Sequence, residues 1–61
     1  SNKELADWIN ENLTYDQLIL EYWNKSDPNS GWIHCSFTLN GNRKQYLRAY
    51  KENGSTKYEP I

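Results

Sequence analysis

Apolar residues near the N-terminus recur at helical spacing, which predicts a helix with one buried stripe. Ser1 and Glu4 have the spacing of a capping box at the start of such a helix. The polar run 10–12 (NEN) propagates a helix poorly, so we expect the helix to end near Leu13. The stripe expected to be buried comprises Leu5, Trp8, Ile9 and Leu13.

The remainder of the chain has the composition and alternation of short strands. Residues 15–23 and 45–50 are rich in side chains that suit a pleated surface, and residues 32–38 alternate in polarity. The run 24–31 (NKSDPNSG) consists of residues typical of turns, and separates the first two of these strands. The face of residues 32–38 that we expect to be buried comprises Ile33, Cys35 and Phe37.

A hairpin is expected near the C-terminus because Asn53-Gly54 is a strong signal for a two-residue turn, after which residues 55–59 fold back. The sequence thus predicts an α+β fold, with one N-terminal helix packed on a small antiparallel β-sheet.

Residues 1–61 are expected to form a single small domain. A domain of this size buries only about 60 % of the surface of its unfolded chain and usually needs additional support. The single Cys35 excludes an internal disulfide, so we expect the domain to belong to a larger assembly.

Charge and hydropathy favour neither nucleic acid nor a membrane as the partner. The formal net charge is −1 with both signs interspersed, whereas phosphate-backbone binding needs a concentrated positive surface. No apolar run approaches the roughly 18 residues of a membrane span. A local basic excess toward the C-terminus is interpreted as a solvated strand face, and comprises Arg43, Lys44, Arg48, Lys51 and Lys57.

The pairing of the first two strands brings the candidate chemistry together. Matching their apolar faces requires paired residue numbers with an odd sum. A sum of 55, which leaves a loop of about the observed length, places Glu21 opposite His34 with Cβ atoms ~5 Å apart. An adjacent register would leave these two residues one diagonal step apart on the same face. The other residues expected on that face, away from the core, are Trp23, Trp32, Ile19 and Ser36.

A carboxylate beside an imidazole on a rigid sheet can do metal chemistry. Neutral imidazole is the commonest metal ligand, and a nearby carboxylate can act as general base on metal-bound water. The same pair is also an ordinary cross-strand contact, and both interpretations remain open. Cys35, on the opposite face, is expected to be a small buried hydrophobe and not a nucleophile.

Three short stretches, in this order and with these gaps, are similar to the closing segment of the zinc D-alanyl-D-alanine carboxypeptidase and phage endolysin peptidase family. One subgroup of that family has D-Q-L-I-x-E, then W-x-H-x-S, then N-R-x-Q. This chain has DQLILE at 16–21, WIHCSF at 32–37 and NRKQYL at 42–47. The resemblance covers roughly residues 5–49. It implies that the chain is a C-terminal fragment of a zinc-dependent hydrolase that cleaves peptides of bacterial peptidoglycan.

The resemblance also implies roles for individual residues. His34 matches the third zinc ligand of the family, whose first two ligands come from an upstream H-x6-D stretch. His34 is the only histidine here, so the family implies zinc in the intact protein and none in this chain alone. Many family members place a glutamate three residues before this histidine, where this chain has Gly31. Glu21 is then the remaining candidate, either as catalytic base or as a residue that orients the imidazole.

Further residues are candidates for contact with substrate or for support of the ligand. For Ser36 the alternative is a plain strand serine. The two tryptophans either line a substrate groove or are covered by a missing N-terminal part or a second copy of the chain. The partner implied by the family is a cell-wall peptide, which places the parent protein in the bacterial cell envelope or in phage delivery. These candidate residues are Ser36, Trp23, Trp32 and Gln17.

Two other functions remain open beside the peptidase fragment. The chain could be a stand-alone, non-catalytic interaction module with the same sheet, or a small interaction domain unrelated to the family. Since one histidine cannot hold a catalytic zinc ion on its own, we predict that the 61-residue chain alone is inactive even if the parent protein is a zinc metallopeptidase.

Overall fold

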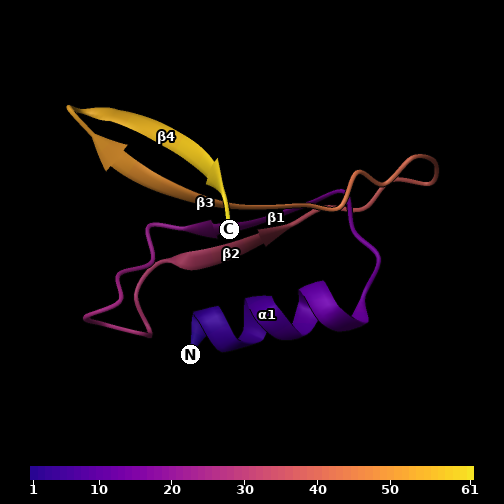
Figure 1. The fold of residues 1–61 in the computed structure, drawn as a ribbon, viewed down its shortest axis with the longest axis horizontal. Helices are drawn as coiled ribbons and strands as arrows, with labels where there is room; N and C mark the ends of the chain where they lie inside the picture. Colours follow the sequence, from indigo (N-terminus) through magenta and orange to yellow (C-terminus); the bar gives the residue numbers. More distant parts are fainter.

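The computed structural model describes all 61 residues and contains one helix and one four-stranded sheet (Figure 1). This confirms the α+β fold expected from the sequence. The helix lies along one side of the sheet, below the strands in Figure 1. It is neither long nor apolar enough to cross a membrane. In chain order the elements are α1 (Asn2–Asn12), β1 (Gln17–Glu21), β2 (Trp32–Cys35), β3 (Gln45–Glu52) and β4 (Ser55–Pro60).

The sheet has the order β2-β1-β3-β4, with β1 and β3 as its inner strands. The β1–β2 and β3–β4 pairs are antiparallel as expected, but β1 and β3 pair in parallel, which the sequence analysis did not predict. The reason is the connection 36–44. It crosses the start of β1, where Asp16 N donates to Ser36 O and Lys44 N donates to Tyr15 O, and so places β3 on the other side of β1.

Helix α1 begins and ends where the sequence predicts. The Ser1 hydroxyl accepts from Glu4 N at 3.2 Å, as in a capping box, and Leu13 is the C-cap. The buried stripe is different, however. Ala6 is fully buried, whereas Trp8 is 54 % exposed and Leu5 is similarly open. The helix thus contacts the sheet through Ala6 and Ile9, which leaves Leu5 and Trp8 outside the contact.

The core lies between α1 and the sheet face that carries Leu18 and Leu20. The expectation that Cys35 and Phe37 are buried with Ile33 was wrong for two of the three residues. Cys35 is exposed and Phe37 is 64 % exposed, because β2 is an edge strand that ends at Cys35. The core cluster comprises Ala6, Tyr15, Leu18 and Leu20, with Ile9, Trp23, Ile33 and Tyr46 packed against it.

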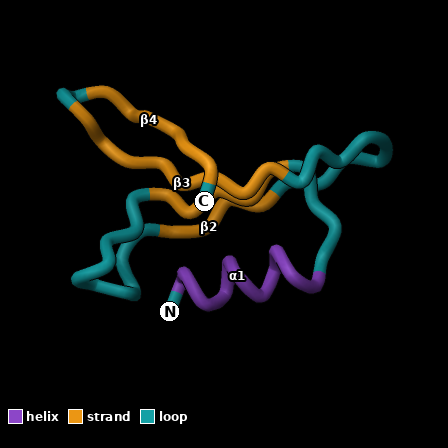
Figure 2. The backbone as a smooth tube through the Cα atoms, viewed as in Figure 1, coloured by secondary structure: helices purple, strands orange, loops and turns teal.

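The β3–β4 hairpin confirms the turn predicted at Asn53-Gly54. Both residues have positive φ, 51° and 78°, which a two-residue turn of the I′ kind requires. Figure 2 shows the tip of the hairpin diverging from the loop that connects β1 to β2. The far half of β3 therefore extends beyond the end of β1, since the β1–β3 register stops at Ala49.

Candidate functional site

The outer face of the sheet, defined here as the face away from α1, carries Glu21 and His34. In the observed register Ile19 pairs with His34 and Glu21 pairs with Trp32, so paired numbers sum to 53. The direct Glu21–His34 pairing expected from a sum of 55 is therefore wrong. The two side chains share the outer face and lie one diagonal step apart, as the adjacent register requires.

The register shifts because of a local irregularity at the end of β1. Tyr22 has φ 55°, in the left-handed region, and Gly31 across from it has φ 68°. These two residues end the ladder at the Glu21–Trp32 pair, so Trp23 never enters it. A non-glycine residue at positive φ is uncommon, and nothing in the polarity pattern of residues 15–23 signals it.

Glu21 is held by its cross-strand neighbour. The indole Nε1 of Trp32 donates to Glu21 Oε2 at 2.8 Å, and the Trp32 ring packs against Tyr22 with centroids 5.4 Å apart. This leaves Glu21 Oε1 available to another donor or proton. His34 is exposed, so its ring is accessible to a ligand. The outer face thus presents one fixed carboxylate and one accessible imidazole.

Trp23 does not lie on this face, contrary to the expectation from strand alternation. It packs against the core cluster on the helix side, and its Nε1 donates to Pro28 O at 3.0 Å. The left-handed backbone at Tyr22 reverses the side-chain alternation and turns Trp23 over. Only Trp32 of the two candidate tryptophans accompanies Glu21 and His34.

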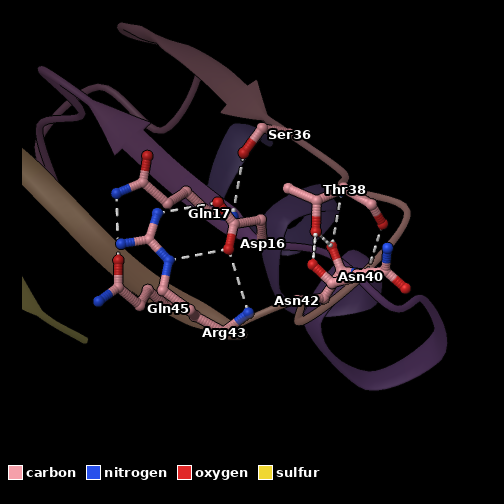
Figure 3. Close-up of polar contacts among 8 residues, drawn as sticks. All are labelled: Asp16, Gln17, Ser36, Thr38, Asn40, Asn42, Arg43 and Gln45. Carbon is pink, nitrogen blue, oxygen red and sulfur yellow. Dashed lines mark hydrogen bonds and ion pairs between the residues drawn. The ribbon is translucent and has the colours of Figure 1, made fainter.

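The stretches that carry the family resemblance meet around Asp16. Its carboxylate accepts from Arg43 Nε at 2.9 Å, from Arg43 Nη2 at 2.8 Å and from the backbone N of Arg43 at 3.1 Å (Figure 3). The hydrogen bonds from Arg43 hold the pKa of the Asp16 carboxyl at about 2. Asp16 is buried, and its ion pair fastens the connection 36–44 where it crosses β1.

Ser36 and Gln17 belong to the same network. The Ser36 hydroxyl accepts from Gln17 N at 3.1 Å, and Gln17 Nε2 donates to Gln45 Oε1 at 3.1 Å (Figure 3). These bonds join the start of β1 to both of its neighbours. The Ser36 oxygen accepts this one bond from the backbone, and its O–H remains available as a donor. Within the connection 36–44, Thr38 N donates to Asn42 Oδ1 at 2.9 Å, and this bond joins the two ends of a short loop.

Gly31, at the position where many family members have glutamate, has no room for a side chain. A Cβ there would lie 2.0 Å from the carbonyl oxygen of Glu21 and 2.8 Å from the carbonyl carbon of Tyr22. A glutamate three residues before His34 is therefore incompatible with this backbone. The carboxylate of this chain on the face of His34 comes instead from Glu21, on the adjacent strand.

The ligand groups of this chain do not amount to a zinc site. No three of its His, Cys, Asp and Glu residues lie close enough together to hold a metal ion. His34 and Glu21 supply at most two donors, whereas a catalytic zinc site needs three protein ligands and an open position. Any zinc held here would need further ligands from outside these 61 residues.

Tyr22 and Tyr58 also contribute to the outer face, which the sequence did not lead us to expect. Tyr22 packs on Trp32 and bonds Thr56 through its hydroxyl at 2.7 Å. Tyr58 pairs with Ala49 and is 56 % exposed, close to the 55 % of Trp32. A period-two pattern in 55–60 could have indicated Tyr58, but only tertiary structure reveals Tyr22.

Comparison with protein-family models, curated proteins and solved structures finds no match to this chain.

Proposed function

We propose that this chain is the C-terminal part of a zinc-dependent cell-wall peptidase and supplies one zinc ligand, His34. The observation that carries the proposal is the common placement of His34 and Glu21 on the outer face, one diagonal step apart. An accessible imidazole beside a carboxylate with one free oxygen is the pair that metal-assisted hydrolysis uses.

The hydrogen bonds of Asp16 with Arg43 and Ser36 are a second observation that supports the proposal. The residues of the three resembling stretches could have been scattered, but Asp16, Ser36 and Arg43 meet at one end of β1. The network fixes where β2 and β3 lie relative to β1. The resembling pattern therefore acts as one structural unit that sets the position of the strand bearing His34.

Uncovered apolar side chains on both layers provide further support. Leu5 and Trp8 on α1, and Trp32 and Tyr58 on the outer face, are each about half exposed. Exposed apolar patches on small soluble domains commonly mark contact with another polypeptide. The remainder of the peptidase, or a second copy of this chain, would cover them and could bring the missing ligands to His34.

Three residues would have separate roles in this site: His34, Glu21 and Trp32. His34 offers an imidazole nitrogen to zinc, which when bound would activate water for attack on a peptide carbonyl. Glu21 Oε1 would be free to accept a proton as a general base or to accept a hydrogen bond that orients the imidazole. Trp32 holds the other oxygen of Glu21 and so limits the rotation of the carboxylate.

The test uses the intact protein. Its coding sequence should place an H-x6-D stretch upstream of Ser1, and the purified protein should hold about one zinc and cleave a cell-wall peptide. His34→Ala should lose both metal and activity. Glu21→Gln should retain metal and lose about 10²–10⁴-fold in kcat if Glu21 is the base. Glu11→Gln, an exposed glutamate on α1, is the matched control.

The 61-residue chain alone should show no zinc-dependent cleavage, because it contributes too few ligands. Cleavage by the isolated chain would overturn the proposed division of the site. An intact protein whose zinc content is unaffected by His34→Ala would overturn the assignment of His34.

A non-catalytic interaction module is the second candidate function. It is favoured by the aromatic character of the outer face, where Trp32 and Tyr58 are exposed. An intact protein without an H-x6-D stretch and without zinc, which nevertheless binds a partner through Trp32, would support this function over the first.

A further inference from the structure

A groove lies between the segment that follows β1 and the far half of β3. It has a volume of about 550 Å³ and opens to solvent. Its position follows from the unequal strand lengths, because β1 stops at Glu21 while β3 continues to Glu52. The cationic and aromatic residues that line it are Lys25, Arg48, Lys51, Tyr22, Trp23 and Tyr50.

The groove is positively charged although the chain as a whole is not. Three cations line it, against the single carboxylate of Glu59 that bonds Arg48 and Tyr50 beside it, in a protein of net charge −1. Lys25 and Lys51 take part in none of the ion pairs of the structure. Arg48 Nε donates to Glu59, which leaves the terminal nitrogens of its guanidinium available for a second carboxylate.

Aromatic rings hold two of the cations in place. The Arg48 guanidinium lies 4.4 Å from the centroid of the Tyr50 ring, and Lys51 Nζ lies 5.9 Å from that of Tyr22. These contacts restrict side chains that would otherwise move freely, and so reduce the entropy cost of binding an anion.

The groove also borders an open strand edge. The last backbone bond between the β1 side and β3 runs from Tyr22 N to Ala49 O at 2.9 Å. Beyond it, the main-chain N–H and C=O of Lys51 have no partner on that side, because the left-handed Tyr22 leads the chain away; those of Tyr50 and Glu52 point to β4. An unpaired edge is a template on which an extended peptide can add main-chain hydrogen bonds.

We propose that this groove binds an extended acidic peptide, which bonds the main chain of Lys51 in β3 and places carboxylates against Lys25 and Lys51. The open edge favours a peptide over a nucleic acid, since only a peptide backbone can complete the ladder. The proposal does not depend on the peptidase function, because none of its residues is a ligand or base candidate.

The experiment follows backbone amide NMR shifts of the chain during titration with an alternating Glu-Val peptide. Shifts are expected at residues 22–25 and 50–52. Lys25→Gln and Lys51→Gln should each weaken binding about two- to five-fold, the size expected for exposed ion pairs. Lys44→Gln, which removes the same charge at the other end of the sheet, should leave binding unchanged.

Three control ligands separate the components of the proposal. A Lys-Val peptide should not bind, and an N-methylated Glu-Val peptide should bind more weakly because it cannot complete the ladder. Equal binding of either one would overturn the proposal. So would the absence of shifts with the acidic peptide, or tighter binding of a single-stranded oligonucleotide of equal charge, which would indicate a nucleic-acid groove.

Discussion

Gly31 lies three residues before His34, at the point where the carbonyl of Glu21 passes closest to another segment. Its φ of 68° and the absence of space for a Cβ both demand glycine. The difference between this chain and those peptidases, in the family it resembles, that have glutamate at that position is therefore part of the backbone. It could not be reversed by substitution without moving the end of β1.

Gly31→Ala should destabilise the fold more than Gly41→Ala. Both glycines have φ near 70°, so each substitution carries the roughly 1–2 kcal/mol cost of a left-handed non-glycine residue. Gly41 has open space around its Cβ position, whereas Gly31 adds a steric clash with Glu21. Urea unfolding of the two variants measures the difference. Equal losses would show that the segment at Gly31 relaxes without cost.

Asp16 should make the fold sensitive to acid. Its pKa is about 2 in the folded protein, against about 3.9 for an unperturbed aspartate. Because the folded pKa is depressed, this stabilisation is fully present above about pH 4 and is lost as pH falls toward 2. Urea midpoints measured between pH 2 and 6 should decline less steeply for Asp16→Asn than for the wild type.

Asp7 is the control for that experiment. The pKa of the Asp7 carboxyl is also lowered, mainly by the hydrogen bond from Lys3. Its side chain is more exposed than that of Asp16, so solvent screens this interaction more strongly. Asp7→Asn should leave most of the acid dependence in place. A wild-type slope retained in Asp16→Asn and lost in Asp7→Asn would assign the acid sensitivity to α1 instead of the β1 crossing.

At the scale of the elements, α1 packs on the sheet through Ala6 and Ile9, and Trp8 lies outside this contact. Trp8→Ala should therefore cost little, about 1 kcal/mol or less, because Trp8 is half exposed. Leu18→Ala should cost about 2–5 kcal/mol, since Leu18 is fully buried beneath the helix. Thermal or urea unfolding of both variants tests this. If Trp8→Ala lost as much stability as Leu18→Ala, Trp8 would have to be buried, as the sequence alone predicts.

The elements could be predicted from the sequence because their signals are local. The cap at Ser1, the end of α1 near Leu13 and the turn at Asn53-Gly54 each depend on a few adjacent residues. The parallel β1–β3 pair could not be predicted, because it depends on how 36–44 crosses β1. The burial of Cys35 was wrongly expected because alternation does not show which strand is at the edge.

For the molecule as a whole, the candidate site was predicted in part. Alternation placed Glu21 and His34 on one face, and that placement is confirmed by the register. The exact pairing of Glu21 with His34 and the face of Trp23 were predicted wrongly, because the left-handed backbone at Tyr22 changes the direction of the side chains that follow it. The groove beside β3 was not foreseen, since its lining comes from segments more than twenty residues apart.

The inner position of β1 has a consequence for hydrogen exchange. Its amides lie between two paired neighbours, and Leu18, Ile19 and Leu20 are all buried. Each of these amides bonds one neighbour only, so those directed to β3 should exchange only through global unfolding, whereas those directed to the edge strand β2 are also released when β2 frays. Amides of the edge strands β2 and β4 should exchange faster by fraying. Mass-spectrometric or NMR exchange would then give the global unfolding free energy from the β1 amides directed to β3.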